Sequence, residues 1–347
     1  MRTVLLLIIA VSVCLPGEVC AGSFDNHGVA FDNHGVAFDN HGVASVRLRR
    51  TFANTGADFL HWRPLNEPGC GGWMVGMRIS PHDPKRMLVT GDMLSAGLST
   101  DGGKTFQTTL GFKTYEMGDV TWHPTDPKTV WVGTVSGPYV SHDGGLHWRE
   151  KRAGMPAILG FGNSAPIEKV LFDPKDAAHL IALGGSSRRW DLHTQDTTAL
   201  GAVWESRDAG EHWKRLATLT DDGFTHDPNA KPGVNIVSGG FAAGSSQRLY
   251  VALDGHGVRV SEDGGQTWEA RNDGLPHLNV ERVIPHLTNP DIAFAALSNH
   301  QKADKTYEPG GVFKTTDGGK HWASISNGLR QNTGTDGNLV ARYKGFA

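Results

Sequence analysis

Short apolar runs alternate with clusters of Gly, Asp, Asn and Pro over most of the chain after Arg50. Two of these runs, Val120–Trp122 and Val130–Val132, flank a turn that contains Asp126-Pro127. Short runs bounded by turn residues, without a sustained 3.6-residue period, are typical of β-strands rather than helices. The pattern therefore predicts an all-β fold built from many short strands.

An eight-residue motif recurs five times with the pattern Ser/Thr-x-Asp-Gly/Ala-Gly-x-Thr/His-Trp/Phe. We call its copies the aspartate turns; they occupy residues 99–106, 141–148, 206–213, 261–268 and 315–322. Glycine adopts positive φ without steric cost, so Asp-Gly-Gly between apolar runs predicts a hairpin turn. The carboxylate can accept backbone N–H bonds, and the final aromatic can pack between neighbouring sheets. We interpret the aspartates as structural, at Asp101, Asp143, Asp208, Asp263 and Asp317.

Two further apolar runs precede each motif, so each unit is predicted as strands A, B, C and D with the aspartate turn between C and D. Successive motif aspartates are 42 to 65 residues apart, a spacing that suits four-stranded propeller blades. We expect residues 46–347 to form a β-propeller with five recognisable blades and six or seven in the complete ring. Either the chain is truncated and Asn338–Arg342 opens a sixth blade, or Phe59–Trp62 completes the last one.

The N-terminus predicts a secretory signal peptide over residues 1–21. Arg2 supplies the positive charge, the apolar run Leu5–Leu15 is too short to span a bilayer, and Val19-Cys20-Ala21 suits cleavage. We therefore expect a secreted or periplasmic protein with no membrane span after cleavage. Cys70 is then the remaining cysteine, which excludes an internal disulfide and favours a small buried apolar role.

Residues 22–45 contain three copies of Phe-Asp-Asn-His-Gly-Val-Ala, beginning at Phe24, Phe31 and Phe38. Asn-His-Gly disfavours a helix in every copy, so a coiled coil is not expected despite the period of seven. The repeated histidines leave metal binding open, but identical short repeats favour a flexible low-complexity linker.

The overall charge excludes several classes of partner. Charged residues make up 20% of the chain and the formal net charge is −3, so nucleic acid and anionic membranes are not expected partners. The histidines outside the heptapeptides are scattered without helical His-x-x-x-His spacing, and we predict no metal site and no cofactor.

The repeated motif resembles the Asp-box (BNR) repeats of sialidases, sortilin-type receptors, photosystem assembly propellers and xyloglucan-cleaving endoglucanases. The resemblance covers about residues 58–323. These families perform different functions on similar blades, so the resemblance implies the fold and leaves the function open.

A local match to the xyloglucanase family lies in the segments Trp62–Leu65, Gly69–Trp73, Ile79–Pro81 and Thr90–Ala96. The resemblance implies that Asp92 is a general base. The family's paired glycines are replaced here by Leu94 and Ser95, and its acid lies in a second propeller for which we expect no room. Similarity to sialidases is limited to Arg78-Ile79-Ser80, without the rest of that class's arginine triad.

Strand parity separates the two faces of the predicted propeller. The A–B and C–D turns lie on one face, and the B–C and D–A loops lie on the other with Asp92. Long loops in compact domains tend to carry function, and those of this face are predicted at residues 107–118, 151–166, 184–203, 218–238 and 298–310. Candidate ligand-binding residues on this face are Trp73, Tyr115, Trp190, Asp191, Asp254 and His256, with Phe161, His193 and Tyr307 nearby.

Three functions remain open from these residues. Aromatic rings beside carboxylates suit a sugar, so we favour a propeller that binds a polysaccharide or an extracellular protein. The alternative is a glycoside hydrolase in which Asp92 works with a second carboxyl, for which the candidates are Glu116, Asp119, Asp191 and Asp254. A structural or assembly propeller, in which Trp73 and Trp190 merely pack the loops, is the third. The sequence leaves the oligomeric state undetermined.

Overall fold

The computed structural model describes residues 74–329, apart from 93–95, 115, 158–164, 187–198 and 228, together with short strands between Ser23 and Val46. Every regular element in these residues is a β-strand, which confirms the predicted all-β class. The chain divides into two compact units, Val11–Asn66 and Met1–Ala10 with Glu67–Ala347. No helix within the described residues has the length and apolar character needed to cross a membrane. The predicted signal peptide and Cys70 lie outside the described residues.

The heptapeptide segment contains four short strands, β1 (Ser23–Phe24), β2 (Ala30–Phe31), β3 (Val36–Phe38) and β4 (Ala44–Val46). They form one antiparallel sheet in chain order. The repeat period spaces the strands, because an Asp-Asn-His-Gly stretch separates each strand from the next. A linker role for residues 22–45 stays a prediction.

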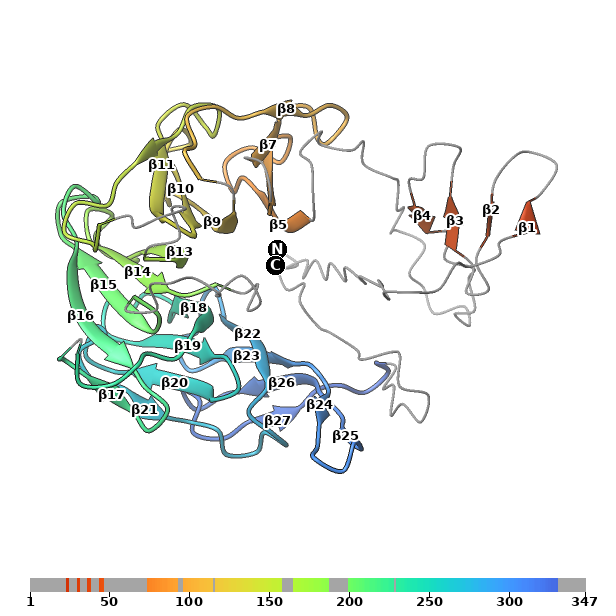
Figure 1. Ribbon diagram of the computed structural model, residues 1–347, viewed down its shortest axis with the longest axis vertical. Coiled ribbons are helices and arrows are strands. Elements are labelled where there is room, and N and C mark those ends of the chain that lie inside the picture. The colour runs from red at the N-terminus through yellow and green to blue at the C-terminus, as the bar shows by residue number, and fades with distance from the viewer. Residues whose placement is uncertain are drawn as a thin grey trace. The chain divides into compact units, whose positions relative to one another are not determined.

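Residues 74–329 fold into five consecutive antiparallel sheets, which follow one another around an arc as the blades of a β-propeller (Figure 1). Blade 1 consists of β5 (Met74–Ile79), β6 (Met87–Gly91), β7 (Ala96–Ser99) and β8 (Gln107–Thr108). Blade 2 consists of β9 (Met117–Trp122), β10 (Val130–Thr134), β11 (Gly137–Ser141) and β12 (Arg149–Glu150). Blade 3 consists of β13 (Ile167–Phe172), β14 (Leu180–Gly184), β15 (Ala202–Ser206) and β16 (Lys214–Leu219), extended by β17 (Phe224–Thr225).

Blade 4 consists of β18 (Ile236–Phe241), β19 (Leu249–Leu253), β20 (Gly257–Ser261) and β21 (Glu269–Ala270). Blade 5 consists of β22 (Val280–Pro285), β23 (Ala293–Leu297), β26 (Gly311–Thr315) and β27 (Ala323–Ser324). Its loop between β23 and β26 carries a small hairpin of β24 (His300–Gln301) and β25 (Tyr307–Glu308). Five four-stranded blades are thus confirmed, and a sixth or seventh stays a prediction.

The first strand of each blade is the innermost one, nearest the middle of the arc in Figure 1. Each inner strand contacts the inner strand of the next blade, from β5 through β9, β13 and β18 to β22. In four of the five blades, the pairing of the inner strand with the second strand shifts register between the first and third residues of the inner strand. Examples are the shifts between Ile167 and Lys169 and between Val280 and Arg282. In β9 the corresponding shift lies between Met117 and Val120. Such bulges redirect side chains at the ends of strands, and here they recur at the same level around the axis.

Hydrogen bonds place the A–B turns and the aspartate turns on the same face, as strand parity predicts. Within each blade, the backbone N–H in the middle of the aspartate turn donates to a carbonyl of the A–B turn. The five bonds are Gly102 to Lys85, Gly144 to Lys128, Ala209 to Ala178, Gly264 to Gln247 and Gly318 to Asp291, at 2.8 to 3.0 Å. We call this the turn face and the opposite one the loop face.

Each aspartate turn is closed by its own side chains. In blade 4, the Ser261 hydroxyl accepts the N–H of Gly265 at 2.8 Å, and Asp263 Oδ1 accepts the N–H of Thr267 at 2.9 Å. The Thr267 hydroxyl donates to the other carboxylate oxygen at 2.6 Å. Burial opposes ionisation of Asp263, but the hydrogen bonds from Thr267 and Ser261 outweigh it and lower the pKa of the carboxyl. These contacts suit a structural role for the aspartates.

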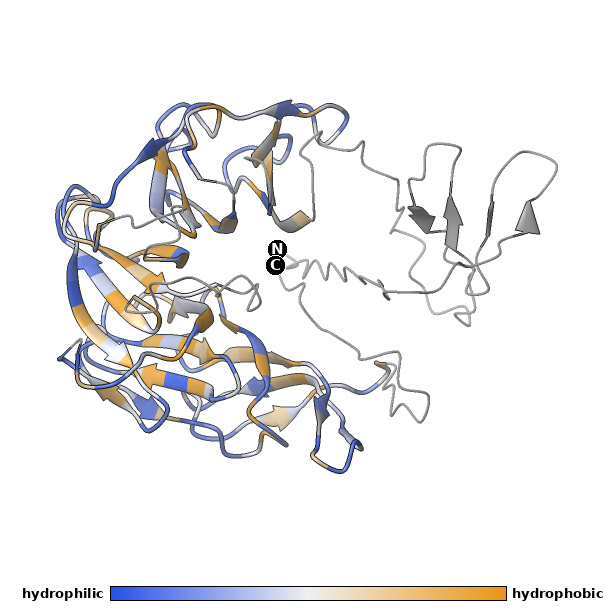
Figure 2. Ribbon diagram, in the orientation of Figure 1, coloured by the Kyte–Doolittle hydropathy of each residue, from blue (hydrophilic) through white to orange (hydrophobic). Residues whose placement is uncertain are grey.

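The core lies between blades, where hydrophobic residues of neighbouring sheets form four clusters. Hydrophobic positions recur along the strands of the blades (Figure 2). The aspartate-turn tryptophans Trp148, Trp213, Trp268 and Trp322 are 1 to 6% exposed and each joins one of these clusters. The four tryptophans therefore pack between sheets, as the sequence predicts, whereas Phe106 of blade 1 is half-buried and lies in none of these clusters. Full burial of such a side chain stabilises by about 3 kcal/mol.

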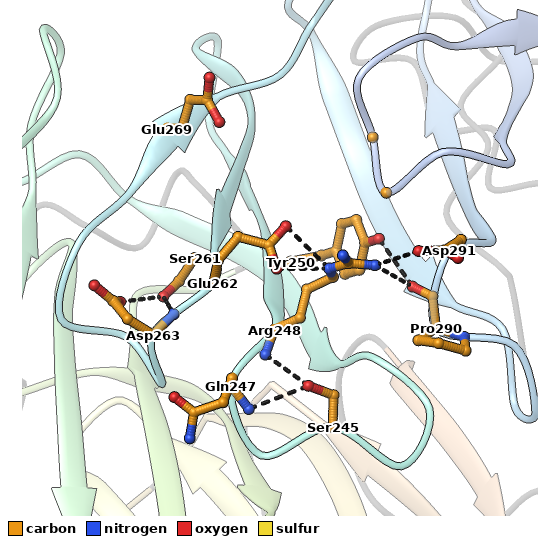
Figure 3. Close-up of polar contacts among 12 residues, drawn as sticks. Ser245, Gln247, Arg248, Tyr250, Ser261, Glu262, Asp263, Glu269, Pro290 and Asp291 are labelled. Carbon is orange, nitrogen blue, oxygen red and sulfur yellow. Dashed lines mark hydrogen bonds and ion pairs between the residues drawn. The ribbon is translucent and has the colours of Figure 1, made fainter.

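A polar junction joins blades 4 and 5 on the turn face (Figure 3). The guanidinium of Arg248, at the end of the A–B turn of blade 4, pairs with Glu262 at 2.8 Å and with Asp291 of blade 5 at 2.7 Å. Its Nη1 also donates to the Pro290 carbonyl at 3.1 Å. Arg86 reaches from blade 1 to the carbonyl of Gly144 in blade 2 in a similar way, at 2.8 Å. Arginine at this position therefore links neighbouring blades.

Candidate functional site

The described residues place part of the predicted ligand-binding set. Asp92 follows β6 directly and is 8% exposed. Asp254 follows β19 directly and is half-buried, as is His256 two residues later. Both aspartates therefore lie at the loop face, where strand B of a blade ends. The remaining predicted residues lie outside the described residues: Trp73, Tyr115, Trp190 and Asp191, with Phe161 and His193.

Polar residues from several blades lie within two residues of a strand end at the loop face. One group follows a B strand and the other precedes an A strand. We call them the loop-face ring: Asp92, Ser186, Asp254 and Asn299 after B strands, and Glu116, Asn235 and Asn279 before A strands. Most members of the ring are far apart in the sequence, because each lies beside the end of a different strand.

Hydrogen bonds connect the ring across blades 2, 3 and 4. The Ser186 N–H donates to Asn235 Oδ1 and Asn235 Nδ2 donates to the Ser186 carbonyl, both at 2.8 Å. The Ser186 hydroxyl donates to Glu116 Oε1 at 3.3 Å. Glu116, Ser186 and Asn235 are each less than 9% exposed. Residues separated by up to 119 positions thus form one fixed, largely buried polar network, because the inner strands bring their ends together.

Asp254 belongs to a neighbouring polar group of blade 4. Its N–H donates to the Asn235 carbonyl at 2.9 Å, and its carbonyl accepts from His256 Nδ1 at 2.7 Å. Arg259 is 6% exposed and donates to the carbonyls of His256 and Asp221, both at 3.2 Å. Burial of the guanidinium lowers the pKa of Arg259. A buried cation thus supports the loop that carries Asp254 and His256.

Charged side chains of the inner strands meet along the axis beneath the ring. We call this group the axial cluster: Arg78 of β5, Asp119 of β9, Glu168 and Lys169 of β13, and Arg282 of β22. Asp119 accepts from Arg78 at 2.8 Å and from Lys169 at 3.0 Å. Glu168 pairs with Arg282 across the axis at 3.1 Å. Four of the five blades contribute, so the cluster ties the blades together at their inner edges.

Two members of the axial cluster, Asp119 and Arg282, are held in their charged forms. Burial alone would raise the pKa of Asp119, but the charges of Arg78, Lys169 and Arg282 hold it well below the usual range of an aspartic acid. Burial would lower the pKa of Arg282, and Glu168 and Asp119 reverse this and raise it. The surrounding opposite charges therefore stabilise the ionised forms of Asp119 and Arg282.

Sequence reasoning recognised only part of this arrangement. Asp119 and Glu116 were predicted as candidate second carboxyls on the loop face, and both do lie near its axis. Asp119 is engaged by two cations, however, and contributes to a structural ion cluster. Lys169 and Arg282 were not predicted at all. The sequence feature that could have revealed them is their position, because Asp119, Lys169 and Arg282 are each the third residue of an inner strand.

The chemistry of the loop face is that of a hydrogen-bonding surface. Its carboxylates accept hydrogen bonds, its amides both donate and accept, and the cations of the axial cluster lie beneath in ion pairs. Within the described residues, no group of three or more His, Cys, Asp or Glu side chains could hold a metal ion.

Comparison with known proteins adds a likeness of fold. No family model and no curated protein matches the chain. An ancestral GH74 enzyme is similar with a TM-score of 0.58 and 21% identity over 78% of this chain and 33% of that one. The GH74 enzyme of Niastella koreensis is similar with a TM-score of 0.51 and 16% identity over 72% of this chain and 38% of that one. The GH74 xyloglucanase of Xanthomonas campestris matches with a TM-score of 0.49 and 18% identity over 73% of this chain and 38% of that one. The chain thus spans about a third of these proteins' length and shares their propeller fold.

Proposed function

We propose that the protein is a glycan-binding propeller whose ligand lies over the loop-face ring. The observation that carries the proposal is the hydrogen-bonded network of Glu116, Ser186 and Asn235, which fixes a carboxylate, a hydroxyl and an amide from three blades around the axis. Sugar hydroxyls both donate and accept hydrogen bonds, so such a surface can bind several of them at once.

Preorganisation favours this function. Glu116, Ser186 and Asn235 are buried and hydrogen-bonded before any ligand arrives, so little side-chain entropy is lost on binding. Trp73, Tyr115 and Trp190 belong by sequence to the same face, and we propose that their rings stack on the apolar faces of the sugar. The fold shared with GH74 enzymes supports a glycan over a protein ligand. Secretion, proposed from residues 1–21, would give access to extracellular polysaccharides.

The test is binding to a panel of xyloglucan, β-glucan and sialylated oligosaccharides by titration calorimetry. Asp254→Asn should weaken binding of the active glycan roughly 10- to 150-fold, because a hydrogen bond to a charged group contributes about 1.5–3 kcal/mol. The matched control is Asp176→Asn, an exposed aspartate of the turn face, which should leave affinity unchanged. Absence of binding to every glycan, together with capture of an extracellular protein, would refute the proposal.

A second candidate is glycoside hydrolysis with Asp92 as general base. The favouring observation is the position of Asp92, buried at the loop face on the same side as Glu116 and Asp254. Hydrolysis needs two carboxyl groups flanking one bond, about 5–10 Å apart. Release of reducing sugar from the bound glycan, lost in Asp92→Asn while binding persists, would establish this activity. Binding without release in the unmodified protein would exclude it for that glycan.

A further inference from the structure

Arg259 lies in the middle of β20, and its guanidinium lies between two turns of the loop face. One turn consists of residues 254–256 of blade 4, and its His256 carbonyl accepts from Nη1 at 3.2 Å. The other consists of residues 220–223, which join β16 to β17 in blade 3, and its Asp221 carbonyl accepts from Nη2 at 3.2 Å. Arg259 is 6% exposed, whereas Asp221 and Gly255 are exposed. The guanidinium is therefore covered by two surface turns where blades 3 and 4 meet.

This guanidinium has unused hydrogen-bonding capacity. Arginine carries five N–H donors, and the two carbonyls accept from Nη1 and Nη2. The Nε of Arg259 is buried and has no hydrogen-bond partner among the described residues. A buried donor without an acceptor is unfavourable, so an acceptor that reaches Nε would satisfy it without breaking an existing contact.

The positive charge of Arg259 is also without a counter-charge. Among the described residues no carboxylate forms an ion pair with it, and burial lowers the pKa of its guanidinium. Arg282 shows the usual arrangement, because this largely buried arginine pairs with Glu168 at 3.1 Å and its pKa is raised. Buried charges are normally paired. The chemistry that would complete the environment of Arg259 is therefore that of a carboxylate.

The aspartates of the two turns have other roles. Asp222 forms an ion pair with Lys231. The backbone carbonyl of Asp221 accepts from Arg259, and that of Asp254 accepts from His256 Nδ1 at 2.7 Å. Carboxylates beside an uncompensated cation suit a ligand that carries both hydroxyl groups and a carboxylate, since the hydroxyls can donate to aspartate while the carboxylate accepts from arginine. A sugar acid has both groups, whereas a simple anion has only one of them.

The turn of residues 254–256 joins this junction to the loop-face ring. The Asp254 N–H donates to the Asn235 carbonyl at 2.9 Å, and Asn235 is bonded to Ser186 on the other side. A glycan that lies over the ring can thus extend one of its units towards Arg259 without leaving the loop face.

We propose that Arg259 is a specificity-determining residue that binds the carboxylate of an acidic sugar unit, of the uronic acid class, between residues 220–223 and 254–256. The inference rests on the proposed function, because a glycan must first bind over the loop-face ring. Nε and a remaining N–H of a neighbouring Nη form the planar fork that matches the two oxygens of a carboxylate.

The test compares an acidic oligosaccharide with its uncharged form of the same shape. Titration calorimetry is performed with an oligogalacturonide and its methyl ester, and with a glucuronoxylan oligosaccharide and its carboxyl-reduced form. The unmodified protein should bind the acidic member of the preferred pair roughly 10- to 150-fold more tightly, as expected for hydrogen bonds to a charged group. Arg259→Gln should abolish this preference and leave the affinity for the uncharged member unchanged.

The matched control is Arg149→Gln, which removes the same charge from an exposed arginine of β12 and should keep the preference for the acidic member. Arg259→Lys serves as a second variant in case Arg259→Gln fails to fold. It keeps the charge without the planar fork, so the preference should fall without disappearing.

The outcomes separate this inference from the proposed function. Binding of a neutral glycan with no preference for either acidic member would overturn the role of Arg259 and leave the proposed function standing. A preference that persists unchanged in Arg259→Gln would also overturn it, as would an equal loss of affinity for both members, which indicates that Arg259 only holds the two turns. Absence of binding to every neutral and acidic glycan would refute both.

Discussion

Replacing Asp119 by asparagine should destabilise the propeller strongly, although Asp119 is far from every aspartate turn in sequence. The substitution keeps the shape of the side chain and removes a charge that contacts Arg78 at 2.8 Å and Lys169 at 3.0 Å. Asp119 is 6% exposed, so the cations would be left near the axis with less compensation. Removing one partner of a buried ion pair costs about 3–5 kcal/mol. For a domain of this size, that corresponds to a Tm lower by roughly 6–20 °C.

The Asp119 carboxyl should also make the unfolding free energy depend on pH. The pKa of Asp119 is held below its unfolded value by Arg78, Lys169 and Arg282 despite burial, so its contribution is fully present above the unfolded pKa of about 3.9. That contribution is lost progressively as the pH falls below the unfolded value towards the folded one. The difference in unfolding free energy between the wild type and Asp119→Asn should therefore shrink as the pH falls below about 4.

The assay is thermal and urea unfolding at pH 7 and at several values below pH 5. The control is Glu211→Gln, which removes a carboxylate from an exposed ion pair with Lys151 at 2.5 Å. Exposed pairs contribute about 0–1 kcal/mol, so this control should shift Tm by at most a few degrees. An effect of Asp119→Asn as small as that of Glu211→Gln would refute the view that the axial cluster ties the inner strands together.

Three further predictions concern the turn face. Asp263→Ala should cost about 1–3 kcal/mol of unfolding free energy by leaving the N–H and hydroxyl of Thr267 without their acceptor, and urea unfolding measures it. Burial opposes ionisation of Asp143, yet hydrogen bonds from His147 and Ser141 lower its pKa to about 2, so Asp143→Asn should flatten the loss of stability between about pH 4 and pH 2. Arg248→Lys should lower Tm although the charge is kept, because lysine cannot reach Glu262, Asp291 and the Pro290 carbonyl together; a Tm equal to wild type would show that charge alone matters.

The sequence predicts the fold well because the aspartate turns carry local information. Asp-Gly-Gly between two apolar runs specifies a hairpin without reference to any distant residue, and the tryptophan that follows specifies packing between sheets. Trp148 and Trp322 confirm this, since each is buried between its own blade and the preceding one. The five blades follow from five such local patterns.

The axial cluster is difficult to predict because its information is not local. Arg78, Asp119 and Arg282 lie on three inner strands, and nothing near any of them in sequence marks a partner. Their meeting depends on the register shift near the start of each inner strand, which a period-two pattern does not reveal. Face parity predicted Glu116 and Asp119 on the loop side, but Asp119 lies within β9, and parity gives no distances, so it could not show that Asp119 is paired with cations.

The location of the ligand tests the central proposal most directly. Hydrogen exchange of the protein with and without a bound oligosaccharide reports which face becomes protected. Binding over the loop-face ring should protect amides near Glu116, Ser186, Asn235 and Asp254 and leave the A–B turn of residues 123–129 unchanged. Protection confined to the A–B turns and the aspartate turns would place the ligand on the opposite face and contradict the account.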